Sequence, residues 1–329
     1  MITPSLPTFS IASAINLPTS GLAQQGKIFA SLGRSVGAII DAANENQAVK
    51  PVALPDDQDG IEELLQRIRA ALGKGKLEEL SDADLDLMLQ HLGSPNPIIR
   101  DKGVFYLFND LIQNQVLTKA QMVRTFDRLT SDQVLFAHIN EKENDAAFLR
   151  SFAVMMLASL IYIDRAGAAF IDHARKNKLV EQLAIYIMLE NDTRGFVANQ
   201  GWVHAYTHIG NVLDELASDE ELLRADKILL MATVIEKFRR LTTPLIYGEP
   251  TRLAVYFADQ LLEDDVYQQF LLIELREWRR ALASTQVRET QAMWNAIFNR
   301  QRLLQAMMLN SNMAKAVVEY LEDSNDFTI

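Results

Sequence analysis

The chain of 329 residues contains no cysteine and is short of glycine and proline. Without thiols, the sequence excludes disulfide scaffolds, cysteine-ligated zinc, iron–sulfur clusters and thiol nucleophiles. The 14 glycines and 9 prolines make up roughly 7% of the residues against a usual ~12%, so the turns that all-β folds require are scarce. Hydrophobic residues account for 49% of the chain, which supplies a core and excludes general disorder. The composition predicts a mostly helical, globular protein.

Positive charge is also scarce, with 32 Lys and Arg against 43 Asp and Glu and a net charge of −11. Nucleic-acid binding depends on basic contacts to phosphate, which this balance opposes. The same repulsion opposes anionic membrane surfaces. The pairs Arg239-Arg240 and Arg279-Arg280 are isolated, and we interpret them as solvated helix faces. We therefore expect neither nucleic acid nor a membrane as a partner.

The sequence lacks a long hydrophobic run of the kind that forms a transmembrane helix or a signal peptide. The uncharged residues before Lys27 are interrupted by three prolines and lack a positively charged start, so they do not predict a signal peptide. Residues 151–163 are strongly apolar but too few to span a bilayer, and we interpret them as a core helix. With no address, the cytoplasm is the expected location.

The first 55 residues are predicted to form an N-terminal arm with one helix. They carry three basic and two acidic residues, a net charge of +1, which leaves −12 on residues 56–329. Apolar residues keep helical spacing over 24–44, where Gly26, Gly33 and Gly37 allow close approach of another helix. We interpret the arm as a packing or leader segment. The alternative is a homo-oligomer formed through residues 20–45. Residues 51–60 are predicted to be a linker.

Residues 56–329 contain helix signals that recur with short connections. Gly73 ends a predicted helix over 61–72, and Pro97 begins another. Further helices are predicted over 119–129, 131–139, 146–163, 166–174, 177–189, 198–216, 219–241, 250–260, 264–281, 286–309 and 312–322. No alternating β pattern is flanked by hairpin turns.

The predicted fold class is all-α. Helix pairs recur about every 35–45 residues, close to the HEAT or armadillo period. We therefore predict that residues 56–329 form one irregular HEAT/armadillo-like helical-repeat domain, an α-solenoid, with a globular helical bundle as the alternative. A solenoid presents a concave surface, on which a functional site is expected.

Two of the five histidines, His204 and His208, stand four residues apart in the predicted helix 198–216. Residues i and i+4 share a helix face, and Asn211 and Glu215 fall within about 60° of the same row. Helical histidine pairs with this spacing can hold zinc, so His204 and His208 are candidate metal ligands. A buried hydrogen-bonded network and a ligand site without metal are the other interpretations.

The opposite face of this predicted helix is apolar and is expected to be buried. It carries Trp202, Tyr206, Ile209, Leu213 and Leu216. Glycines at 195, 201 and 210 allow a neighbouring backbone or a ligand to approach closely. Polar side chains from other segments could fold toward the histidines and complete a groove. The candidate groove residues are Arg150, Glu190, Asp192, Arg194, Trp202, His204, His208, Asn211, Glu215, Glu249 and Arg252.

Motifs of known catalytic classes are absent from the sequence. It has no P-loop, no GxGxxG after a predicted strand and no GxSxG elbow. His91, His138 and His173 are scattered, and we interpret them as surface or capping histidines. The sequence therefore leaves open whether the protein is an enzyme.

Four short motifs resemble a bacterial family of domains of unknown function, number 2785. They are Arg150-Ser-Phe, Arg194-Gly-Phe-Val, Gly201-Trp-x-His-Ala-x-x-His208 and Gly248-Glu-x-x-Arg-Leu253. The resemblance covers about residues 60–285, so the arm lies outside it. The family often has Asp three residues after the second histidine, where this chain has the neutral Asn211. The resemblance implies no established activity.

Three functions follow from these patterns. The first is a non-enzymatic binding or interaction module that uses a polar groove around residues 190–215 for a protein, peptide or small molecule, with no cofactor expected. The second is a hydrolase dependent on zinc or another divalent metal, with His204 and His208 as ligands and Glu190, Asp192, Glu215 or Glu249 completing the site. The third is a structural or assembly protein that acts through the N-terminal arm.

Overall fold

The computed structural model describes residues 22–44, 50–284 and 289–324, which are mostly helical and include one two-stranded sheet. Residues 1–21 and 45–49 of the predicted arm lie outside the described residues. The all-α prediction is confirmed. The elements are α1 (Leu22–Asn44), α2 (Ile61–Gly73), α3 (Asp82–Gln90), η2 (His91–Gly93), η3 (Ile98–Phe105), α4 (Tyr106–Gln113), α5 (Lys119–Leu129), α6 (Asp132–Leu135), α7 (Ala146–Ile163), η4 (Asp164–Ala168), α8 (His173–Leu189), β1 (Phe196–Val197), β2 (Gly201–Trp202), α9 (Ala205–Ala217), α10 (Arg224–Arg240), α11 (Glu249–Glu263), α12 (Asp265–Ser284), α13 (Gln291–Leu309) and α14 (Lys315–Ser324).

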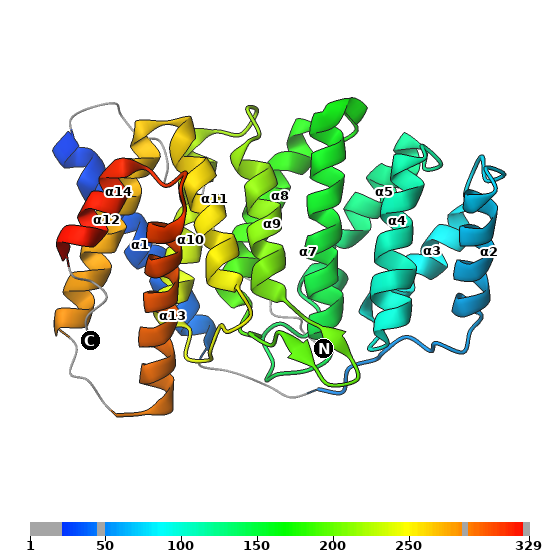
Figure 1. The fold of residues 1–329 in the computed structure, drawn as a ribbon, viewed down its shortest axis with the longest axis horizontal. Helices are drawn as coiled ribbons and strands as arrows, with labels where there is room; N and C mark the ends of the chain where they lie inside the picture. The colour runs from blue at the N-terminus through cyan, green and yellow to red at the C-terminus, as the bar shows by residue number, and fades with distance from the viewer. Residues whose placement is uncertain (1–21, 45–49, 285–288, 325–329) are drawn as a thin grey trace, which may run out of the picture.

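The helices from α7 onward pack in two rows. In one row α7, α9, α11 and α13 contact one another in that order, and in the other α8, α10, α12 and α14 do the same. Figure 1 shows the chain running from α2 at the right to α13 and α14 at the left. Each helix buries its apolar face against neighbouring helices in its own row and in the other row.

Helix α1 leaves the order of the sequence and lies against α8, α10 and α12. Its Phe29, Val36 and Ile40 are buried. The ring of Phe29 meets that of Phe270 on α12 edge-on, with centroids 5.2 Å apart. The predicted arm helix is therefore present, and its apolar face is covered by helices of the same chain.

Two glycines bring α1 close to charged side chains of α10 and α12. A Cβ on Gly33 would lie 3.0 Å from the Glu274 carboxylate, and one on Gly37 would collide with the guanidinium of Arg240. Larger residues at these positions would separate the helices. The glycines thus allow close helix packing, as their spacing predicts.

The interpretation of Arg239 and Arg240 as a solvated face is wrong. Arg239 pairs with Glu236 and Glu274, and Arg240 pairs with Glu236 and with Asp41 of α1. The carboxylates of Glu236 and Glu274 are buried beneath α1. A nearby cation stabilises a buried carboxylate, and the two arginines lie at ion-pair distance from these acids.

Helix α7 is the central core helix. With the turn that follows, it is long and apolar enough to cross a membrane by length and composition, but 72% of its most apolar window is buried inside the fold. It packs against α5, α6 and α9. This burial agrees with the prediction of a core helix over residues 151–163.

The helices predicted over 131–139 and 166–174 are shorter than expected or missing. The helix predicted over 131–139 contains only α6, and His138 beyond it has a φ of +52°. No regular helix covers 169–172, because Gly167 and Ala169 are left-handed, with φ of +114° and +47°. Helix α8 then starts at a new cap, where the Asp172 carboxylate accepts from the Arg175 amide.

His91 is a buried residue. It is only 1% exposed and faces Asp57 and Asp59 of the segment before α2. His138 pairs with Glu141, whereas His173 is an exposed residue at the start of α8. His91 is therefore not a surface residue, but it is the C-cap of α3, which agrees with the capping alternative.

Candidate functional site

Residues 194–204 form a hairpin between α8 and α9. Strand β1 pairs antiparallel with β2, so that Phe196 lies opposite Trp202. Figure 1 shows the hairpin beyond the lower end of α9. The predicted helix 198–216 therefore begins only at Ala205. Asn199, Gly201 and His204 have φ of +65°, +78° and +53°, which a right-handed helix cannot accommodate.

The later start of this helix changes which residues lie on the two faces predicted for it. Tyr206 and the apolar residues after it are buried as expected, but Trp202 lies in β2 and is 37% exposed. His208 is buried, and His204 precedes the helix. The four polar residues therefore do not form one row that faces a groove.

A buried ion pair holds the segment before the hairpin. Arg150 of α7 donates from Nε and Nη2 to the two carboxylate oxygens of Glu190, over 2.9 and 3.0 Å. Its Nη1 donates to the Ala137 carbonyl. Burial would raise the pKa of Glu190, but the charge and hydrogen bonds of Arg150 outweigh it, and the pKa is lowered. Arg150 and Glu190, both predicted as groove residues, therefore form an ion pair with a structural role.

A second ion pair fixes the start of the hairpin. Asp192 accepts from the backbone amide of Arg194 over 2.9 Å and from its guanidinium. The Arg194 Nη2 also donates to the Asn144 carbonyl. Burial raises the pKa of Asp192, while the hydrogen bonds of Arg194 oppose that shift. Both candidates are therefore occupied in positioning the backbone.

Arg100 holds the hairpin from a part of the chain in which no candidate was predicted. Its buried guanidinium donates to the carbonyls of Ser94 and Gln200, each over 2.8 Å. It also stacks over Phe148 and Phe152, 4.3 and 4.7 Å from the ring centroids. Such contacts make a short hairpin rigid. Nothing in the local sequence distinguishes Arg100 from a surface arginine.

His208 is a neutral histidine in the core. Its Nδ1 lies 2.7 Å from the Ser151 hydroxyl and 3.0 Å from the Ser151 carbonyl. The carbonyl can only accept, and the hydroxyl donates to the Val203 carbonyl, so Nδ1 carries the proton. Burial lowers the pKa of His208 to about 3. Because Nδ1 is protonated and Ser151 donates elsewhere, the pair lacks the geometry of a serine nucleophile and its base.

His204 lies against the exposed tryptophan of the hairpin. Its ring centroid is 4.0 Å from that of Trp202, with planes 34° apart. Burial lowers the pKa of His204. Among the described residues, its buried Nε2 has no hydrogen-bond partner. A left-handed backbone and an unsatisfied ring nitrogen in one residue mark a strained position.

Phe196, Trp202, His204 and Tyr247 form a contiguous cluster, here called the aromatic surface. The Trp202 ring meets those of Phe196 and Tyr247 edge-on, with centroids 5.1 and 5.3 Å apart. Phe196 is 53% exposed and Tyr247 44%. Gly195 permits this arrangement, because a Cβ there would collide with the Tyr247 ring. Sequence reasoning missed Phe196 and Tyr247.

Asn211, Glu215 and Arg252 lie together at a different place. They line a pocket of about 300 Å³ between α4, α7, α9 and α11. Arg252 donates to Asn211 and to Asp214, and Glu215 pairs with Arg165 over 2.8 Å. These three candidates therefore lie together, but apart from the hairpin and from the two histidines.

Glu249 begins α11 and is buried. Its Oε2 accepts from the Tyr247 amide over 2.8 Å. Burial raises the pKa of Glu249, and this hydrogen bond opposes the shift. The residue therefore fixes the backbone that presents Tyr247, which connects it to the aromatic surface indirectly.

The donor set does not fit the metal site that the sequence suggested. The ring centroids of His204 and His208 are 6.3 Å apart, and the rings are perpendicular. In the described ranges, no group of three or more His, Asp or Glu side chains could hold a metal ion. The acids considered as third ligands are engaged elsewhere, Glu190 by Arg150 and Glu215 by Arg165.

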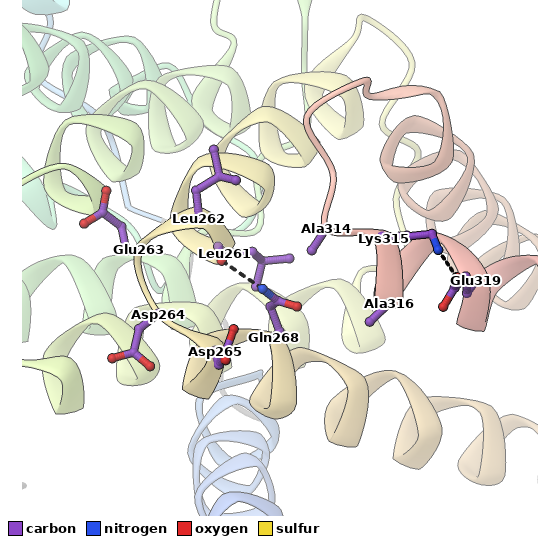
Figure 2. A pocket seen from close by; sticks show the side chains of 10 residues that line it. All are labelled: Leu261, Leu262, Glu263, Asp264, Asp265, Gln268, Ala314, Lys315, Ala316 and Glu319. Atoms are coloured by element: carbon purple, nitrogen blue, oxygen red, sulfur yellow. Dashed lines mark hydrogen bonds and ion pairs between the residues drawn. The ribbon is translucent and has the colours of Figure 1, made fainter.

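A larger pocket, of about 620 Å³, lies where α11, α12 and α14 meet. Figure 2 shows Lys315 turned toward Glu319 on one side and Asp264 and Asp265 on the other. Its lining includes none of the predicted site residues. We therefore place the candidate site at the hairpin, where rigid packing and exposed aromatic rings coincide.

Comparison with known families defines the class of the protein. A family model described as protein of unknown function (DUF2785) matches residues 135–309, more than half of the chain. The chain belongs to this family, which confirms the resemblance over a span that starts and ends later than expected. The matched segment contains the hairpin and all candidate residues, but not Arg100. Neither curated proteins nor solved structures give a match.

Proposed function

We propose that the protein is a binding module that recognises a peptide segment of another protein through the aromatic surface. The observation that carries the proposal is the exposure of Phe196, Trp202 and Tyr247 in one contiguous cluster. Exposed apolar clusters of this kind mark interaction sites, and aromatic side chains dominate binding energies at such sites.

Rigidity supports the same proposal. Arg100, Arg194 and Glu249 hold the backbone on both sides of the aromatic surface through buried or half-buried hydrogen bonds. A surface that is already in its binding conformation loses little conformational entropy when a partner docks.

The proposed partner segment is basic and contains apolar side chains. The chain has a net charge of −11, and the carboxylates of Glu143 and Asp145 lie beside Arg194 at the edge of the hairpin, 69% and 32% exposed. Complementary charge favours association with cationic segments. Apolar side chains of the segment would contact Trp202 and Phe196.

The proposed architecture is a HEAT- or armadillo-like repeat. Successive pairs, α7 with α8, α9 with α10, α11 with α12 and α13 with α14, place their first helices in one row and their second helices in the other. Stacked pairs of this kind present connecting loops at the ends of the helices. The hairpin is one such connection.

Selection from a displayed library of random peptides tests the proposal. We expect enrichment of peptides with Lys or Arg next to apolar residues. Their affinity should fall at least about tenfold in a Phe196→Ala/Trp202→Ala variant, as for truncated hot spots. The matched control is Tyr106→Ala, since Tyr106 is an exposed aromatic residue on α4. Equal binding to the double variant, or no enrichment, would refute the proposal.

A further inference from the structure

The pocket that contains Asn211, Glu215 and Arg252 plays no part in the peptide binding proposed above. It has a volume of about 300 Å³ and lies between α4, α7, α9 and α11. Pockets for small molecules span about 300–1,000 Å³, so this one has the size for a small ligand. Its lining includes no ring of the aromatic surface. The pocket is therefore a second, separate place to look for a ligand.

The wall formed by α4 and α7 is largely apolar. It contains Ile112, Met155, Ala158 and Ile163, of which Ile112 and Ala158 are buried. The Tyr162 ring also lines the pocket and is 58% exposed. Contact with such a wall removes apolar surface of a ligand from water. This side of the pocket therefore suits an aliphatic, thioether or aromatic group.

Asn211 on the opposite wall presents a hydrogen-bond donor. Its Oδ1 accepts from Arg252 Nε. Because a guanidinium can only donate, the amide oxygen must face Arg252, and Nδ2 points elsewhere. Nδ2 lies 3.2 Å from the sulfur of Met155, which is a weak acceptor. Asn211 therefore has an amide donor that a stronger acceptor in the pocket would bind.

Arg252 is held next to Asn211 by a close approach of α11 to α9. A Cβ on Gly210 would lie 2.7 Å from Cγ of Arg252, so the glycine leaves room for the arginine stem. Nη2 of Arg252 donates to Asp214 over 2.7 Å. Within the described ranges, its Nη1 makes no hydrogen bond. Nη1 is thus a second donor on the same wall.

Glu215 supplies an acceptor on this wall. Its Oε2 accepts from Arg165 over 2.8 Å, whereas Oε1 has no hydrogen-bond partner in the part of the chain that the structure describes. Burial raises the pKa of Glu215, and the charges of Arg165 and Arg252 oppose the shift. Glu215 and Arg252 therefore lie close enough to interact, and each has one atom available to a ligand.

The charges around the pocket are balanced without a ligand. Glu215 and Arg252 are the charged residues of its lining. Arg252 pairs with Asp214 over 2.7 Å, and Arg165 pairs with Glu215 over 2.8 Å. A ligand with a net charge would place an uncompensated charge in a partly buried site, which costs free energy. A zwitterion avoids that cost and matches both the donors and the acceptor.

We propose that this pocket binds a free α-amino acid with an apolar side chain. The carboxylate of the amino acid accepts from Arg252 Nη1 and Asn211 Nδ2. Its ammonium group donates to Glu215 Oε1. Its side chain lies against the apolar wall of α4 and α7.

Isothermal titration calorimetry of the full chain with L-leucine, L-methionine and L-phenylalanine tests the proposal. At least one of them should bind with a Kd below about 1 mM. Isocaproate lacks the ammonium group of leucine, and isoamylamine lacks its carboxylate. Each analogue should bind at least about tenfold more weakly than leucine, because it loses a hydrogen bond between charged groups. No binding of any of the three amino acids, or equal binding of either analogue, would overturn the proposal.

Variants then locate the binding. Glu215→Gln keeps the shape of the side chain and removes its charge, so affinity should fall at least about tenfold. The matched control is Glu277→Gln, in an exposed ion pair, which should bind as the parent does. Ser159 lines the pocket on α7, and Ser159→Leu should abolish binding by filling the space while leaving every charge in place. Parent-like affinity in either pocket variant, once circular dichroism shows that it is folded, would overturn the proposal.

A last variant keeps this proposal separate from the peptide-binding function. Phe196→Ala/Trp202→Ala alters only the aromatic surface, which shares no residue with the pocket. It should bind the amino acid with the affinity of the parent. If Ser159→Leu does not fold, Gly210→Ala takes its place, because the added Cβ displaces Arg252 and should weaken binding at least about tenfold. Unchanged affinity in that variant would equally overturn the proposal.

Discussion

Arg150 and Glu190 join α7 to the end of α8 through two parallel hydrogen bonds that are closed to solvent. The Tyr206 hydroxyl donates to the backbone carbonyl of Glu190 over 2.7 Å, which extends the contact to α9. The pair therefore sets the positions of the three elements that surround the hairpin. Its role is structural, although both residues looked like groove candidates in the sequence.

Removing Arg150 should be strongly destabilising. An Arg150→Met variant leaves the Glu190 carboxylate buried without its cation, which costs about 3–5 kcal/mol of unfolding free energy. Urea denaturation measures the loss. The double variant Arg150→Met/Glu190→Gln should lose less than the sum of its single variants. As a control, Arg280→Ala breaks the exposed pair with Glu277 and should cost less than about 1 kcal/mol. A small effect at Arg150 would contradict the assigned role.

His208 should make the fold sensitive to acid. Burial holds the pKa of His208 at about 3 in the folded protein, below its ordinary value of 6.5, so the unfolded chain binds a proton first as the pH falls. The contribution is complete above pH 6.5 and is lost as the pH falls toward 3. Between pH 7 and pH 5 it amounts to about 2 kcal/mol. Urea denaturation at these two pH values measures the difference.

The matched variant for this prediction is His208→Asn, whose amide can donate to Ser151 but does not titrate. Its unfolding free energy should change less between pH 7 and pH 5 than that of the parent. Acids elsewhere titrate in both proteins, so only the difference between the two profiles reports His208. Parallel profiles would show that His208 does not remain neutral in the fold.

Gly195→Ala should disrupt the aromatic surface without removing an aromatic ring. Its Cβ collides with the Tyr247 ring, so Tyr247 must leave its place against Trp202. We expect peptides selected for the parent to bind at least about threefold more weakly, a modest loss compared with removal of a hot spot. Gly73→Ala is the control, because a Cβ at Gly73 meets no atom within 4 Å. Unchanged binding would mean that Tyr247 is not part of the surface.

Gly37→Ala should loosen α1. The added Cβ collides with Arg240, and the ion pair of Arg240 with Asp41 must rearrange. Amide exchange in residues 29–43 should accelerate while exchange in α9 stays the same. Exchange in α1 as slow as in the parent would contradict the close packing assigned to Gly37.

The same variant tests the prediction of a homo-oligomer through residues 20–45. If α1 packs only within its own chain, light scattering gives the same mass for the parent and Gly37→Ala. A mass that falls on substitution would instead support assembly through α1. The measurement therefore distinguishes packing within the chain from packing between chains.

Most helices could be predicted from the sequence because apolar periodicity and local caps are encoded over short distances. Residues 119–129 and 146–163 form helices with the predicted bounds. Thr118 and Gln121 form a complete capping box at the first of these. Local signals of this kind do not depend on the rest of the fold.

The candidate site was less predictable because its shape depends on left-handed residues and distant contacts. The spacing of His204 and His208 suggested one helix face, but the φ of +53° at His204 places it before the helix. Non-glycine residues rarely adopt this conformation, so no sequence rule indicated it. Gly201, four residues before the true helix, was the available signal.

Contacts between distant residues were beyond prediction from one sequence. Arg100 bonds to Gln200 and Arg165 to Glu215. These pairs form because packed helices bring their ends together, and nothing near either residue in the chain specifies the other. From the sequence, Glu190 and Glu215 were identified as candidate site residues, as was Arg150, the partner of Glu190. Arg165, the partner of Glu215, was not identified.

The contact between Arg100 and the hairpin bears on where the protein can be divided. The family match begins at residue 135, whereas the guanidinium that supports Gln200 comes from η3. A fragment that begins at residue 135 would contain every ring of the aromatic surface. It would lose Arg100, which holds the hairpin that carries Phe196 and Trp202. The unit of sequence similarity is therefore smaller than the unit that must fold together, and truncation for structural or binding work should begin before α2.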